Sequence, residues 1–122
     1  MIHNRLPATK TALLITLNAY LYGDEKGKAI TRYKLTRKSL KNLSRRKTLQ
    51  SRFVFDVANE LQELGWQLIE DGDGNYCFFD REMTANWPRL SAIRIKELRD
   101  SSEKELCFQL DAYQAAEETE EE

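Results

Sequence analysis

The chain of 122 residues is 41% hydrophobic and 32% charged, and its formal net charge is −1 at pH 7. These values exclude an intrinsically disordered chain and predict a single folded domain over residues 1–116. No signal peptide and no apolar segment long enough to cross a bilayer is recognisable, so we expect a cytoplasmic protein that does not insert into membranes.

The first expected element is a helix that begins at Thr9 or Thr11 and runs to Tyr22. Either threonine can cap the helix, and Gly23 is expected to end it. The larger apolar residues recur at helical spacing and predict one side that faces the core. These residues are Leu13, Leu14, Leu17, Tyr20 and Leu21.

A short strand and a capped helix are expected next. Residues 29–35 hold β-branched and aromatic side chains among Thr, Arg and Lys, a composition that suits a strand. Thr36 then precedes a two-turn helix over residues 37–43, and its hydroxyl is a suitable N-cap. Leu40 and Leu43 are expected to anchor this helix to the core.

The longest helical pattern covers residues 49–64 and follows a basic connector at residues 44–48. Gly65 lies where a C-terminal cap belongs. The first turn carries Arg52 while acidic residues follow, an order that opposes the helix dipole, so the basic start does not serve helix stability. The apolar stripe of this helix contains Phe53, Val57, Leu61 and Leu64.

A hairpin closes the well-patterned part of the chain. Two β-prone runs, residues 66–70 and 76–80, flank the turn 71–75, whose sequence is Asp-Gly-Asp-Gly-Asn. This combination is the most specific local signal in the chain. The turn also matches part of a calcium-binding loop, but Tyr76 occupies a position that requires glycine, so we expect a turn without metal.

Helices are expected beyond the hairpin at Pro88–Arg99 and at about residues 103–116. Trp87, beside a proline and outside any clear pattern, is the aromatic residue most expected to be exposed or to lie in an interface. Five of the last six residues are acidic, and residues 117–122 are therefore expected to form a disordered tail.

Charge is distributed unevenly along the chain. The segment Lys26–Arg52 contains eleven Lys and Arg residues and no Asp or Glu, whereas the remainder is acidic. A local cationic block beside well-patterned apolar segments is typical of nucleic-acid binders. The alternative is a solvated basic face with no ligand.

The element order of helix, short strand, short helix, connector, longer helix and hairpin resembles that of winged helix-turn-helix domains. The resemblance covers about residues 9–80. It implies an α+β, mostly helical fold with one β-hairpin wing, followed here by extra C-terminal helices and the acidic tail. In this family the second helix of the pair enters the major groove, and the wing contacts the backbone or the minor groove. The acidic turn 71–75 departs from the basic wings that contact DNA.

The resemblance also implies which residues contact DNA. Residues at the start of the second helix would face the bases, and the connector would hold phosphates. Flanking contacts would come from the strand and the first helix of the pair. The implied DNA-binding residues are Arg32, Lys34, Arg37, Lys38, Lys41, Arg45, Arg46, Lys47, Thr48, Gln50, Ser51 and Arg52.

The sequence therefore predicts a sequence-specific or general binder of double-stranded DNA, as a transcriptional regulator or a mobile-element or phage accessory factor. A homodimer through the C-terminal helices is a further hypothesis. The alternatives are a winged-helix module that docks an acidic protein partner, and an RNA-binding protein. We expect no enzyme, no cofactor and no small-molecule ligand, because the catalytic motifs are missing and Cys77 and Cys107 are not spaced as metal ligands.

Overall fold

The computed structural model describes residues 4–120 and has an α+β fold. The chain divides into two compact units, one ending at Trp87 and the other beginning at Pro88. The boundary falls inside what the sequence predicted to be one domain with a helical extension. Among the described helices, none combines the length and the apolarity that a membrane crossing requires.

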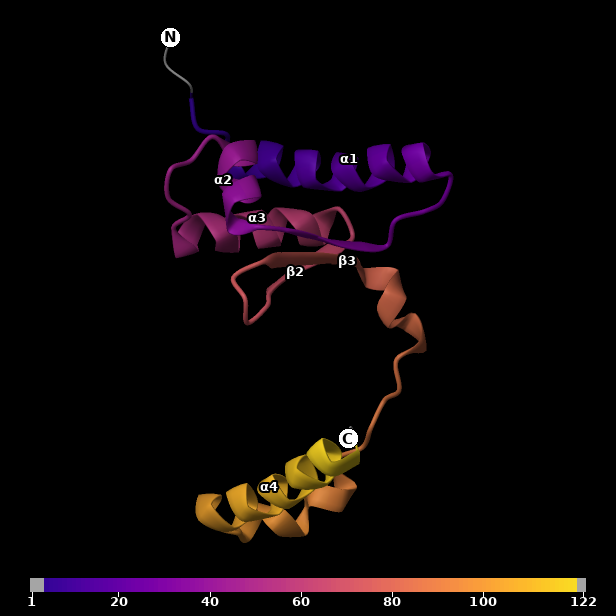
Figure 1. Ribbon diagram of the computed structural model, residues 1–122, viewed down its shortest axis with the longest axis vertical. Helices are drawn as coiled ribbons and strands as arrows, with labels where there is room; N and C mark the ends of the chain where they lie inside the picture. The colour runs from indigo at the N-terminus through magenta and orange to yellow at the C-terminus, as the bar shows by residue number, and fades with distance from the viewer. Residues whose placement is uncertain (1–3, 121–122) are drawn as a thin grey trace. The chain divides into compact units, whose positions relative to one another are not determined.

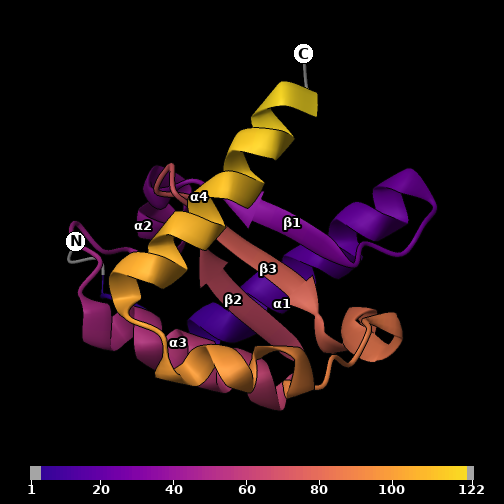
Figure 2. The ribbon, with the colours of Figure 1, turned by 90° about the horizontal axis from the view of Figure 1, so that it is seen from below.

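The first unit combines three helices with a small antiparallel sheet. Its strands follow the order β1-β3-β2, so that β3, the second strand of the hairpin, lies in the middle. The three helices lie on one face of this sheet (Figure 1; Figure 2). The elements are α1 (Ala8–Lys26), β1 (Arg32–Leu35), α2 (Arg37–Ser44), α3 (Ser51–Glu63), β2 (Trp66–Glu70) and β3 (Tyr76–Asp80).

A single hydrophobic core joins the helices to the sheet. Helix α3 contributes Phe53, Val57 and Leu61, as its spacing predicts, whereas Leu64 is 40% exposed. The hairpin strands supply Trp66, Tyr76 and Phe78 from the sheet face that the helices cover. Burial of these side chains is the main source of stability for this unit. The strand, the capped helix, the long helix and the hairpin predicted from the sequence are therefore confirmed, with small shifts of their ends.

Helix α1 differs from the prediction at both ends. No threonine caps it: Pro7 occupies the N-cap position, and the Thr11 hydroxyl donates to the Pro7 carbonyl at 3.0 Å. Gly23 does not end the helix, which continues to Lys26 and ends at Gly27, where φ is 68°. Gly23 is instead a packing residue, because a Cβ there would lie 2.7 Å from the Lys28 carbonyl oxygen.

The prediction of which face of α1 is buried is also wrong. The core takes Ala12, Ile15 and Ala19 from the opposite side of the helix. Small side chains at this contact allow α1 to lie close to α3. Leu14 is half-buried, and the other four residues of the predicted face are exposed. They are Leu13, Leu17, Tyr20 and Leu21.

The second unit holds one long helix and shorter turns. Helix α4 (Glu103–Glu120) confirms the predicted C-terminal helix and extends it through residues 117–120, where a disordered tail was predicted. Residues 121–122 lie outside the described part of the chain. The predicted helix at Pro88–Arg99 is wrong: short 3₁₀ turns cover Ile93–Ile95 and Glu97–Asp100. Most side chains of that segment are exposed, so a regular helix there would gain little from packing.

Candidate nucleic-acid interface

Helix α2 is fixed at both ends by local hydrogen bonds. The Thr36 hydroxyl oxygen accepts from the Ser39 N–H at 3.0 Å, as its predicted capping role requires. Leu40 is 1% exposed and attaches the helix to the core. At the other end the buried Ser44 hydroxyl donates to the Leu40 carbonyl at 2.7 Å. The connector to α3 therefore starts from a rigid point.

The connector turns away from α2 through a residue in the left-handed conformation. Arg45 has φ 58° and ψ 41°, and its N–H donates to the Asn42 carbonyl. Among the described residues it is the only one other than glycine with a positive φ. Glycine is the residue that this position in a helix cap favours. The chain thus carries a cation where backbone conformation alone would favour glycine.

Replacing Arg45 by glycine is expected to separate stability from binding. Relief of the left-handed strain should raise the free energy of unfolding by about 0.5–1 kcal/mol, after the added flexibility of the unfolded chain is counted. The sequence predicts that Arg45 binds a phosphate of DNA, and on that prediction its removal should weaken DNA binding roughly fivefold at moderate salt. Urea unfolding and a binding titration measure the two effects. The matched control is Lys47→Gly, which removes a cation without a strained φ, so a stability gain shared by both variants would contradict this account.

A hollow of about 370 Å³ lies at the start of α3. Four cationic residues and two neutral polar residues line it, and none of the described lining residues carries a carboxylate. The cations include Arg5 from the N-terminal arm, which sequence reasoning did not select. The lining residues are Arg5, Arg45, Arg46, Lys47, Thr48 and Gln50.

The N-terminus of α3 adds partial positive charge to this hollow. The helix starts at Ser51, two residues later than predicted, so Thr48 and Gln50 precede it. Gln50 occupies the N-cap position without a side-chain capping bond, and no acidic residue lies in the first turn. The first N–H groups of α3 therefore have no hydrogen-bond acceptor within the described chain. The positive end of the helix dipole lies at the same place. Such an end favours anions.

Arg46 has a different role from its neighbours. Its guanidinium carbon lies 3.5 Å from the centre of the Phe53 ring, and Nη2 donates to the Leu6 carbonyl at 3.0 Å. Burial, and then the positive charge of Arg5, lower the pKa of Arg46. Its Nε is buried and has no hydrogen-bond partner within residues 4–120. Arg46 therefore packs between the connector, α3 and the N-terminal arm. Because its guanidinium is held there, it is less available for the phosphate contact that the sequence predicts.

The N-terminal arm is held against the connector from two sides. The Leu6 N–H donates to the Ser44 carbonyl at 3.0 Å, while its carbonyl accepts from Arg46. The Leu6 side chain is 7% exposed. These contacts fix the chain next to Arg5 and leave the Arg5 side chain exposed at the hollow. No local pattern around residue 5 gives this position, because it depends on contacts with residues 44 and 46.

The other predicted DNA-binding residues lie on separate elements. Ser51 and Arg52 are exposed in the first turn of α3, where Arg52 forms a 3.2 Å ion pair with Asp56. Along β1, Tyr33 and Leu35 pack toward the core, so Arg32 and Lys34 point to the opposite face of the sheet. Three more belong to α2: Arg37, Lys38 and Lys41.

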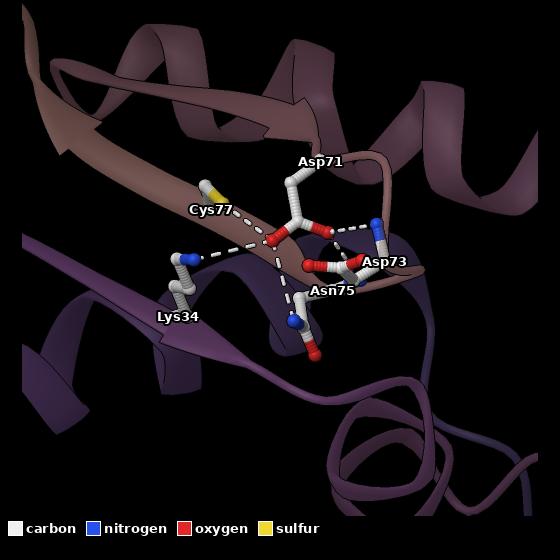
Figure 3. Close-up of polar contacts among 5 residues, drawn as sticks. All are labelled: Lys34, Asp71, Asp73, Asn75 and Cys77. Carbon is white, nitrogen blue, oxygen red and sulfur yellow. Dashed lines mark hydrogen bonds and ion pairs between the residues drawn. The ribbon is translucent and has the colours of Figure 1, made fainter. Parts of the chain in front are cut away.

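The tip of the hairpin is organised around one carboxylate. One oxygen of Asp71 accepts from the Asp73 and Asn75 N–H groups at 3.0 and 2.9 Å. Its other oxygen accepts from the Asn75 side chain and from Lys34 Nζ, both at 3.2 Å (Figure 3). The Asn75 N–H bond is the main cause that lowers the pKa of Asp71 to about 2. Lys34 is thus paired with the tip of the hairpin, and its hydrogen bond to Asp71 raises the pKa of Lys34.

The charge on Asp71 is expected to make the stability of the hairpin depend on pH. Because its pKa in the folded state lies below the ordinary value of 3.8, the ionised form stabilises the fold above about pH 4. This contribution should be lost as the pH falls through about 2. The difference in melting temperature between the native chain and Asp71→Asn should therefore be largest at neutral pH and shrink in acid. Asp73→Asn is the control, since the Asp73 carboxylate has no hydrogen bond or ion pair in the described chain; an equal effect there would contradict the assignment.

The described part of the chain contains no cluster of side chains that could hold a metal ion, and its two cysteines are not paired. No three His, Cys, Asp or Glu side chains between residues 4 and 120 are grouped so as to hold a metal ion. Cys77 is half-buried, Cys107 is exposed, and both are free thiols.

Comparison of the chain with protein-family models, with curated proteins and with solved structures gives no match. The geometry and charge of the chain itself are therefore the only indications of its function.

Proposed function

We propose that this chain binds duplex DNA as a winged helix-turn-helix protein that regulates transcription or assists a mobile element or phage. Helices α2 and α3 are the helix pair, and the hairpin of β2 and β3 is the wing. The element order α1, β1, α2, α3, β2, β3 supports this proposal, as does the pairing of β1 with β3.

The observation that carries the proposal is the cationic hollow at the start of α3. Four cations line the hollow beside the N-cap residue Gln50, and the first N–H donors of α3 have no partner in the described chain. This arrangement is favourable for a phosphate group. The net charge of the two units also supports the proposal, because the unit that contains the hollow is positive and the other is negative. Residues 1–87 hold 14 Lys and Arg against 10 Asp and Glu, a net charge of +4, while residues 88–122 hold 5 against 10, a net charge of −5.

The proposed contacts differ in kind. Arg5, Arg45 and Lys47 bind phosphates, and this contact places the start of α3 in the major groove. Gln50 and Arg52 then reach base edges, for which Arg52 must give up its ion pair with Asp56. The wing tip, with its two aspartates, stays away from the phosphates because like charges repel.

A gel-shift series with random duplex DNA, single-stranded DNA and structured RNA tests the proposal. Duplex binding should weaken linearly with the logarithm of the salt concentration, at roughly 0.9 per phosphate bound. Preference for structured RNA would shift the proposal to an RNA-binding protein. Failure to retain any nucleic acid at low salt would contradict it, and would favour an acidic protein as the partner of the hollow.

A further inference from the structure

Helix α1 is apolar on two opposite faces, and only one of them is covered within its unit. Ala12, Ile15 and Ala19 are at most 3% exposed and belong to the core. On the other side Leu13 is 46% exposed and Leu17 is 51% exposed. Leu21, one turn further on, is 60% exposed. Three leucines at intervals of four residues form a continuous stripe along a helix.

The order of residues on this face is symmetric about Leu17. Leu13 and Leu21 stand four residues on either side of it, and Leu14 and Tyr20 stand three on either side. Seven positions away, the face ends in a lysine on one side and an aspartate on the other: Lys10 and Asp24. The face therefore has matching apolar positions and opposite charges about its centre.

We propose that this face of α1 binds the same face of a second copy of the chain, with the two helices antiparallel and Leu17 at the twofold axis. Rotation about that axis brings Leu13 of each copy onto Leu21 of the other and Leu14 onto Tyr20. It also brings each Lys10 next to an Asp24. A twofold contact must be complementary to itself, and this sequence of side chains meets that requirement.

The terminal charges select the antiparallel arrangement. Lys10 and Asp24 are exposed, and neither has an ion pair or hydrogen bond to another side chain within residues 4–120. In an antiparallel pair two Lys10–Asp24 contacts form, one at each end of the interface. A parallel pair would instead place Lys10 beside Lys10 and Asp24 beside Asp24, which is unfavourable.

The length of the α1 face limits how much surface the dimer can bury, and therefore how tightly the two copies associate. A helix of 19 residues is about 28 Å long, and one helix seam buries less surface than the roughly 800 Å² per partner of a standard stable interface. The expected dimer is therefore reversible and dissociates on dilution. This inference does not depend on the proposed DNA binding, since it concerns another surface of the unit.

Sedimentation velocity of the full chain over a concentration series tests the proposal through a charge exchange. Lys10→Glu alone and Asp24→Lys alone should each weaken dimerisation roughly tenfold, because each variant places like charges at both ends of the interface. An equimolar mixture of the two variants should form mixed dimers. Every mixed dimer pairs opposite charges at both ends, Glu–Lys at one and Asp–Lys at the other, whereas the like-charged homodimers are disfavoured. The double variant should dimerise as the native chain does.

Controls separate this contact from a change in net charge or fold. Lys28→Glu and Glu63→Lys make the same charge changes at exposed positions outside the face and should leave dimerisation unchanged. Circular dichroism checks that each variant keeps its helices. A native chain that stays monomeric, a double variant that fails to associate, or a dimer insensitive to both single substitutions would each overturn the proposal. The last result would be expected for a dimer through the C-terminal helices.

Discussion

Replacing Arg5, Arg45 and Lys47 together by alanine is expected to weaken the binding of random duplex DNA about a hundredfold at roughly 0.15 M salt. The log–log salt dependence should become shallower by about 2.7, at about 0.9 for each phosphate that the variant no longer binds. The reduction should be similar for every DNA sequence, because phosphate contacts carry no base information.

The fold should survive this triple substitution. Arg5, Arg45 and Lys47 are exposed, and none of the three side chains forms an ion pair in the described part of the chain. Arg46 is left in place because its guanidinium packs on Phe53. Fluorescence anisotropy over a salt series gives both the affinity and the slope, and circular dichroism reports the fold.

A matched control removes three cations from the other unit. Arg89, Lys96 and Lys104 are exposed there, and their replacement by alanine changes the net charge by the same amount. The control should alter the salt dependence much less than the substitution at the hollow. If both variants behave alike, net charge rather than the hollow determines binding. An unchanged slope in the hollow variant, with an intact fold, would contradict DNA binding at the hollow and favour an acidic protein as its partner.

Local signals in the sequence predicted the elements that local contacts form. Thr36 caps α2 because a hydroxyl three residues ahead of a free N–H is sufficient for that bond. The hairpin follows from two β-prone runs and an Asp-Gly turn, and the Asp71 carboxylate completes it through bonds to its own neighbours. In both cases the partners lie within a few residues, so the sequence shows all of them.

Helix α1 shows where such reasoning failed. Large apolar residues normally mark the buried face of a helix. Here α3 lies so close to α1 that Ala12, Ile15 and Ala19 fit the contact, and the leucines are left outside. Gly23 resembles a stop signal in the sequence, although its small size is needed beneath the Lys28 carbonyl. Whether such a residue is buried, exposed or a helix end depends on which elements pack against the helix. The local sequence around the helix does not show those elements.

The chemistry of the candidate site was predicted from the sequence, but its full set of residues was not. The cationic segment placed Arg45 and Lys47 together, and both line the hollow with Thr48 and Gln50. The sequence pattern did not indicate Arg5, which reaches the hollow because Leu6 is anchored beside it. The pattern also did not distinguish Arg46, which packs on Phe53, from the exposed cations. Charge composition shows how many cations a segment has, whereas packing decides which of them a ligand can reach.

Alanine at Arg46 is expected to destabilise the first unit by about 2–3 kcal/mol. The substitution removes the stacking on Phe53 and the charge-assisted bond to the Leu6 carbonyl, and it uncovers part of the Phe53 ring. The melting temperature should fall by about 8–20 °C, as followed by circular dichroism or calorimetry. DNA binding should weaken as well, because the arm that carries Arg5 is then held by one anchor instead of two.

Two matched variants show whether packing or charge is responsible. Arg46→Lys keeps the cation but lacks the planar group that stacks on an aromatic ring, so it should recover only part of the stability. Arg45→Ala removes a cation from the adjacent, exposed position and should change the melting temperature much less than Arg46→Ala. Equal melting temperatures for Arg46→Ala and the native chain would show that the guanidinium is free to leave Phe53. Arg46 would then rejoin Arg45 and Lys47 as a phosphate-binding residue, and the salt dependence of the Arg46→Ala variant would decrease by about 0.9.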